Sequence, residues 1–154
     1  MGRGADQREI VRLLDRYAEA LDTRTWALLD EVFAPEVEFD FGAWRATSRA
    51  EAVAAIRSYL DACGPTQHLL GNYRVEIDCE RATSRVYVRA FHLGIGAAQG
   101  LVYEMGGEYR DELRRTPDGW RSFRRHASVL FETGSRAVLG AGRSRPEPGT
   151  RGAE

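Results

Sequence analysis

The period of the apolar residues changes once along the chain, near residue 66, and this change constrains the fold most strongly. Before it, apolar residues recur at the i, i+4, i+7 and i+11 spacing of one helix face, at Ile10, Leu14, Tyr17 and Leu21. After it, apolar and polar residues alternate as in half-buried strands. Helices followed by antiparallel strands predict an α+β domain with the helices on one face of a curved sheet.

The individual elements can be placed from their end signals. We predict a helix over 6–23 with Asp6 as N-cap, and a short helix from Thr25 that ends before Pro35. A strand over 36–41 follows, and a capping box of Ser48 and Glu51 opens an alanine-rich helix over 49–63. Four strands are expected near 67–79, 83–94, 99–115 and 119–132, with the Asp-Gly turn at 118–119 between the last two.

One domain accounts for most of the 154 residues. It is expected to cover residues 6–132. Residues 133–154 are rich in Gly, Arg and Pro, and they predict a tail that is mostly disordered.

The charge balance and the cysteines limit the classes of partner. With 22 basic and 23 acidic residues, the chain lacks the positive surface expected of a nucleic-acid-binding protein. No apolar run approaches the roughly 20 residues of a spanning helix, and the first residues lack the apolar core of a signal peptide. We therefore expect a cytoplasmic protein with reduced Cys63 and Cys79, although one disulfide between them stays open.

A carboxylate and a histidine are the first candidates for chemistry. Asp22 ends the apolar stripe of the first helix, and His68 stands in the segment TQHLLGN. Each is a weak signal alone, since a helix-end Asp is usually solvated and a strand His usually belongs to the core. Together, a carboxylate that holds one ring N–H would make His68 a general base.

Further candidates come from strand and helix faces. Arg125 is expected to share a strand face with Phe123. It is predicted to pair with a carboxylate of the neighbouring strand, Glu108 or Asp111, or to anchor a substrate oxygen, and both can hold together. Tyr17 either packs in the core or donates to a substrate. The remaining candidates for lining a substrate pocket are His92, Phe41, Trp26 and Phe123.

No cofactor or metal is expected. His68, His92 and His126 lie 24 and 34 residues apart, unlike the close pairs of zinc sites. The Gly-rich segment GIGAAQG lies between two strands and is interpreted as a hairpin connection, and no G-x-S-x-G motif occurs.

Three segments, LDTRTWALLDEVFAPEVEFDF, QHLLGN and GGEYRDELRRTPDGWRSFRR, carry a family resemblance. Over about residues 6–132 the chain resembles the SnoaL-like group of the nuclear-transport-factor-2-like superfamily. The resemblance implies a cone-shaped α+β barrel, in which three helices pack on a strongly curved sheet around an apolar pocket. Members include polyketide cyclases, scytalone dehydratase, bile-acid dehydratase, a dehydrochlorinase, ketosteroid isomerases, epoxide hydrolases and binding modules.

The resemblance also implies roles for particular residues. The dehydratases and the dehydrochlorinase share an Asp on the first helix and a His on the strand after the third helix, which here are Asp22 and His68. Bile-acid dehydratase adds a tyrosine at the position of Tyr17 and an arginine at that of Arg125. The chain departs from scytalone dehydratase, which has a tyrosine at the position of Phe41 and a second histidine with no counterpart near residues 97–98.

These observations predict a cofactor-independent lyase or isomerase for a hydrophobic, ring-containing small molecule of secondary metabolism. A polyketide or polyether cyclase, or a non-catalytic binding or dimerisation module, are the alternatives. Apolar residues are expected on both faces of the sheet, with Tyr87, Phe91 and Leu93 opposite Val86 and Val88. One face therefore needs a cover, and a homodimer is predicted, with a trimer as second choice.

Overall fold

The computed structural model describes residues 2–140. Its helices are α1 (Arg3–Thr23), α2 (Arg49–Leu60) and the 3-10 helices η1 (Trp26–Glu31), η2 (Gly96–Ala98) and η3 (Arg136–Val138). Its strands are β1 (Phe33–Asp40), β2 (Arg45–Ala46), β3 (Thr66–Asp78), β4 (Arg81–Leu93), β5 (Val102–Thr116) and β6 (Gly119–Gly134).

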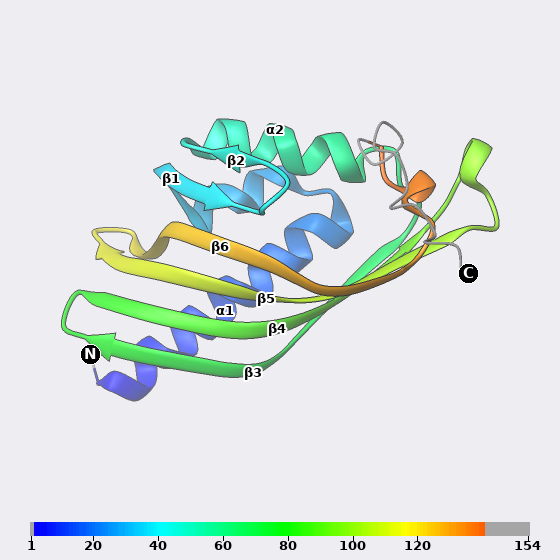
Figure 1. The fold of residues 1–154 in the computed structure, drawn as a ribbon. Coiled ribbons are helices and arrows are strands. Elements are labelled where there is room, and N and C mark those ends of the chain that lie inside the picture. The colour runs from blue at the N-terminus through cyan, green and yellow to red at the C-terminus, as the bar shows by residue number, and fades with distance from the viewer. Residues whose placement is uncertain (1, 141–154) are drawn as a thin grey trace, which may run out of the picture.

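The strands form one mixed sheet in the order β2-β1-β6-β5-β4-β3. All neighbours are antiparallel except β1 and β6, which run parallel. Figure 1 shows the long strands bending around α1, while α2 lies over the end formed by β1 and β2. The predicted α+β cone is confirmed, although the sheet stays open and does not close into a barrel.

The first helix carries the predicted stripe, because Ile10, Leu14, Tyr17 and Leu21 are all buried. The prediction of Asp6 as N-cap is wrong: α1 begins earlier, at Arg3, and Asp6 lies within its first turn. There it forms an ion pair of 2.6 Å with Arg115, since a carboxylate at a buried position needs a charged partner.

The second predicted helix forms only as the 3-10 helix η1, and the next strand starts earlier than expected. Pro35 lies inside β1, where the pairing register with β6 shifts between Phe33 and Glu38. Proline has no N–H to donate to a ladder, so this irregularity accommodates it.

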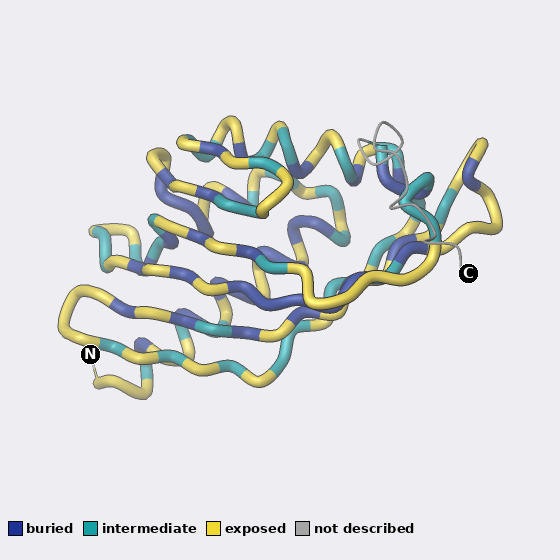
Figure 2. Tube along the Cα trace, viewed as in Figure 1, coloured by how far each residue is buried: buried dark blue, intermediate teal, exposed yellow. Residues whose placement is uncertain are grey.

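The two faces of the sheet differ in burial. Along β4, Val86, Val88 and Ala90 are buried on the concave face, while Tyr87 and Phe91 are each 39% exposed on the convex face. Figure 2 shows this alternation along the strands. The core therefore lies between the concave face and the helices, as the period-two pattern predicts.

Regular structure continues past residue 132, where the domain was expected to end. Strand β6 continues to Gly134, and η3 brings Val138 and Leu139 into the core, where they are 0% and 8% exposed. The rest of the predicted tail, residues 141–154, lies outside the described residues. No disulfide joins the buried Cys63 to the exposed Cys79, so the alternative of a disulfide between them is wrong. Within residues 2–140, no helix has the length and apolar character that crossing a membrane demands.

Candidate functional site

A cavity of about 480 Å³ opens between the concave face of the sheet, α2 and the end of α1. This volume is in the range of small-molecule sites. One wall is aromatic: the rings of Phe41 and Trp44 stack with centroids 5.6 Å apart and planes 9° apart. The predicted residues Phe41, Tyr17, His68 and His92 all line the cavity.

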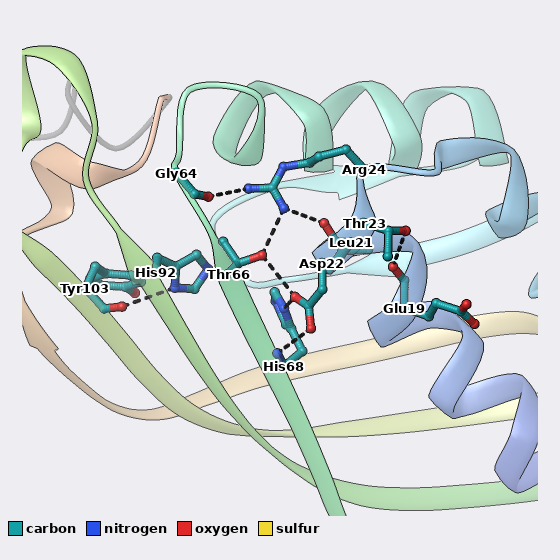
Figure 3. A network of polar contacts seen from close by, with 10 residues as sticks. All are labelled: Glu19, Leu21, Asp22, Thr23, Arg24, Gly64, Thr66, His68, His92 and Tyr103. Atoms are coloured by element: carbon teal, nitrogen blue, oxygen red, sulfur yellow. Dashed lines mark hydrogen bonds and ion pairs between the residues drawn. The ribbon is translucent and has the colours of Figure 1, made fainter.

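The end of α1 is fixed by Arg24, which adopts the left-handed conformation with φ 57° and ends the helix. Its guanidinium donates hydrogen bonds of 2.9 Å to Thr66 Oγ1 and to the carbonyl oxygen of Gly64. These bonds tie the helix end to the start of β3, and they bring Asp22 against the strand that carries His68 (Figure 3).

Asp22 and His68 form the predicted dyad. The Nδ1 atom of His68 lies 2.7 Å from Asp22 Oδ1, and the backbone N–H of His68 donates to Asp22 Oδ2 at 2.8 Å. Thr66 Oγ1 donates to the same carboxylate at 2.9 Å. Asp22 is therefore not the solvated helix-end residue of the simpler interpretation: three donors hold its carboxylate toward one imidazole (Figure 3).

The electrostatics of the pair favour a charged carboxylate at Asp22. Burial alone would raise the pKa of Asp22, but the hydrogen bonds from the ring and backbone of His68 and from Thr66 together lower that pKa. An ionised Asp22 accepts the Nδ1–H of His68, which leaves Nε2 as the basic nitrogen. The imidazole side chain is only 5% exposed. The arrangement can therefore take a proton from a molecule in the cavity and stabilise the resulting imidazolium.

His92 provides a second imidazole beside the first. Its ring lies edge-on to that of His68 with centroids 5.5 Å apart, and its Nδ1 lies 3.2 Å from the carbonyl oxygen of Tyr103. Burial, together with the neighbouring His68, lowers the pKa of His92 to about 4. A second histidine thus reaches the cavity from β4, not from the segment near residues 97–98 where sequence comparison sought it.

Arg125 lies behind the cavity wall. It is fully buried and donates from Nε and Nη2 to Asp111 at 2.8 Å each, as one of the two predicted pairings requires. Four aromatic rings surround the guanidinium, with centroids between 4.2 and 6.0 Å away. Burial opposes its charge, but Asp111 more than compensates and raises the pKa of Arg125. Arg125 is not among the residues that line the cavity.

Two tyrosines stand between Arg125 and the cavity. The rings of Tyr17 and Tyr109 pack edge-to-face at 5.5 Å, both lie over the guanidinium, and both line the cavity. Burial raises the pKa of each phenol, so both hydroxyls remain donors. The two phenols therefore contact both the guanidinium of Arg125 and the cavity, and Tyr109 is a candidate that the sequence did not single out.

Two predicted lining residues do not reach the cavity. Trp26 packs under the guanidinium of Arg57 at 5.8 Å, and Phe123 packs under that of Arg114 at 4.5 Å. Phe123 leaves the face of Arg125 because the register of β5 and β6 shifts between Glu112 and Leu113. A strand bulge changes which side chains share a face, and the alternation in the sequence does not show it.

Polar residues from the end of β6 also line the cavity and escaped the sequence analysis. Tyr103 Oη donates to Glu132 Oε2 at 2.7 Å, and Arg136 donates from Nε to the same atom at 3.0 Å. Both Glu132 and Arg136 lie in the segment predicted to be tail or its border, which is why no role was sought there. Among residues 2–140 no group of three or more His, Cys, Asp or Glu side chains is arranged to hold a metal ion.

Comparisons with known proteins agree with this architecture. A family model described as the SnoaL-like domain matches residues 3–126. An uncharacterised protein of Mycobacterium tuberculosis is 34% identical over 130 residues, which cover 83% of this chain and 88% of that protein.

Solved structures extend the likeness to the fold. The Kfla4162 protein from Kribbella flavida superposes with a TM-score of 0.83 at 26% identity, over 93% of this chain and 100% of the other. A hexachlorocyclohexane dehydrochlorinase from Novosphingobium barchaimii superposes with a TM-score of 0.76 at 15% identity, over 86% of this chain and 92% of the other.

Proposed function

The chain belongs to the SnoaL-like family of the nuclear-transport-factor-2-like superfamily, and from this premise we propose that it is a cofactor-independent lyase or isomerase. Its substrate would be a hydrophobic, ring-containing small molecule with a C–H bond next to a carbonyl. The observation that carries the proposal is the 2.7 Å contact of His68 Nδ1 with Asp22, which leaves Nε2 as base in an aromatic cavity.

The reaction would begin with proton transfer to His68. Nε2 takes the proton from the carbon next to the carbonyl, and the C–H electron pair forms an enolate. Asp22 stabilises the imidazolium, while Tyr17 and Tyr109 donate hydrogen bonds to the enolate oxygen. Arg125 is a positioning residue in this scheme, because it acts through the two phenols.

The second step decides between the two reaction types. In a dehydration the enolate re-forms the carbonyl, a C=C bond forms, and the β C–O bond breaks as His68 returns its proton to the departing hydroxyl as water. In an isomerisation the same proton returns to a different carbon. His92 stays neutral beside His68, so it adds a polar edge to the cavity without a competing positive charge.

A second candidate is a polyketide or polyether cyclase in the same cavity. The stacked wall of Phe41 and Trp44 supports it, since a flat wall can hold a folded chain or planar ring near its reacting conformation. This reaction depends on shape more than on His68.

Deuterium exchange tests the leading proposal. We expect the protein to accelerate exchange at the acidic carbon of a cyclic ketone probe such as 2-tetralone in D2O, measured by NMR. His68→Ala should abolish the acceleration while the fold is retained by circular dichroism. A folded His68→Ala protein that exchanges at the wild-type rate would favour the cyclase or a binding module.

We also propose a homodimer. The strands carry apolar side chains that are 39–65% exposed, among them Phe91, Leu130 and Phe131. Large apolar side chains left exposed in this number often mark an interface. Light scattering at micromolar concentration should report twice the monomer mass of 17.3 kDa, and Leu130→Lys should shift it toward the monomer. A monomer in the wild type contradicts the proposal.

A further inference from the structure

The register of the sheet places a second polar residue, Glu132, in the same rung as His68, three strands away. His68 pairs with Ala90, Ala90 with Met105, and Met105 with Glu132, so one rung of the sheet runs from His68 to Glu132. Three interstrand spacings of about 4.8 Å put the two ends about 14 Å apart along the strands' surface. All four residues line the cavity, with Ala90 and Met105 as an apolar floor between two polar ends.

The far end is built from Tyr103, Glu132 and Arg136. Tyr103 Oη donates to Glu132 at 2.7 Å, and Arg136 forms an ion pair with the same carboxylate through Nε and Nη2. The side chains of Arg136 and Glu132 are 29% and 30% exposed, whereas Tyr103 is only 7% exposed. Burial and the bond to Glu132 raise the pKa of Tyr103, so its hydroxyl keeps the proton that it donates.

This end of the cavity offers one hydrogen-bond acceptor, on Tyr103, and donors on Arg136. With its proton directed at Glu132, the Tyr103 hydroxyl oxygen presents its lone pairs as an acceptor. Arg136 offers the N–H groups of Nη1, which make no hydrogen bond to any of the residues 2–140. Glu132 neutralises Arg136, so this ion pair carries no net charge of its own and gives a free anion little attraction.

We infer that Tyr103 and Arg136 form a specificity site for a neutral hydroxyl group at the end of the substrate remote from the carbon that His68 deprotonates. A hydroxyl group donates one hydrogen bond and accepts another, which matches the acceptor on Tyr103 and the donor on Arg136. The cavity floor between the two ends is apolar, so the substrate class is a ring ketone of about two rings that carries a distal hydroxyl. The inference rests on the proposed function for its reacting end.

Three probes test it: 2-tetralone, 6-hydroxy-2-tetralone and 2-tetralone-6-carboxylate. By calorimetry, the hydroxylated ketone should bind about tenfold more tightly than 2-tetralone, as expected for one net hydrogen bond. In Tyr103→Phe and in Arg136→Gln this ratio should fall toward one, while affinity for 2-tetralone stays nearly unchanged. Tyr87→Phe, on the convex face, is the matched control and should keep the wild-type ratio.

The test separates this inference from the proposed reaction. Binding is measured in His68→Ala as well, where the tenfold preference should persist although exchange is lost. A preference that survives both Tyr103→Phe and Arg136→Gln, or a carboxylate that binds most tightly, overturns the specificity site. If a folded His68→Ala protein still exchanges at the wild-type rate, the proposed reaction is overturned instead.

Discussion

Two acidic side chains of this protein each hold a basic partner, yet the two pairs differ in access. Asp111 holds Arg125 with two bonds of 2.8 Å, and both side chains are 0% exposed. Asp22 holds His68 at 2.7 Å, but the carboxylate is 23% exposed and the imidazole lines the cavity. The first pair is sealed behind aromatic rings, and the second faces the space where a ligand fits.

The difference assigns a role to each pair. A guanidinium does not release its proton in a protein, so the sealed pair can only hold the core and set a local field. An imidazole can gain or lose a proton near neutral pH, and the open pair is therefore suited to chemistry. Removing a partner should cost activity at the open pair and folding stability at the sealed pair.

The largest effect is expected at the open pair. His68→Ala should lower the rate of probe exchange by about 10²–10⁴-fold, and Asp22→Asn should do the same because it removes the charge that supports the imidazolium. The double variant should be little slower than the worse single variant, since the residues act as one unit. Initial rates of deuterium exchange give all three values. Additive losses would show two independent roles.

A large effect on stability is expected at the sealed pair. Arg125→Met leaves the carboxylate of Asp111 buried without its partner and should cost about 3–5 kcal/mol of unfolding free energy. Urea titration measures this loss, and Asp22→Asn should lose clearly less. Replacing both members, as Arg125→Met with Asp111→Leu, should recover most of the stability. If Arg125→Met unfolds no more easily than Asp22→Asn, the two pairs do not differ as described.

The sequence predicted the open pair better than its surroundings. Asp22 was singled out at the end of the apolar stripe and His68 beyond the switch to period two, and the family resemblance linked the two residues. Arg125 was recognised, and one of its two possible partners is the observed Asp111. Its position behind the wall depends on the packing of four rings, which no periodicity encodes.

The failures have local physical causes. Phe123 was assigned to the wrong face because the strand register shifts by one residue beside it. Glu132 and Arg136 were missed because the segment is polar and Gly-rich, whereas η3 seats Val138 in the core. Both errors arise where tertiary packing overrides a local pattern.

The histidine beside the open pair should make stability depend on pH. The pKa of His92 falls to about 4 in the folded protein, against about 6.5 in the unfolded chain. Between these values the unfolded state binds more protons, so stability falls as the pH is lowered from about 6.5 to about 4. The loss should be about 3 kcal/mol at the acid end of this window.

His92→Asn tests this dependence, since its amide can replace Nδ1–H as donor to the carbonyl of Tyr103 without titrating. Urea titrations at pH 7 and pH 4.5 should show a smaller difference for the variant than for the wild type. Asp22, His68 and Arg24 also act on His92 and are unchanged in the variant, so any contribution of theirs is common to both profiles. An equal pH dependence in both proteins would mean that His92 is not the group responsible.

The smallest effect on the exchange rate is expected at the phenols of Tyr17 and Tyr109, between Arg125 and the cavity. Tyr17→Phe and Tyr109→Phe each remove one proposed donor to the enolate oxygen while keeping the ring that packs on Arg125. Because two hydroxyls share the task, each change should slow exchange by about tenfold, less than the loss seen when a sole oxyanion donor is removed. The melting temperature should move little. A folded double phenylalanine variant that exchanges at the wild-type rate would show that the field of Arg125 does not reach the reacting atoms, and the sealed pair would then serve the core alone.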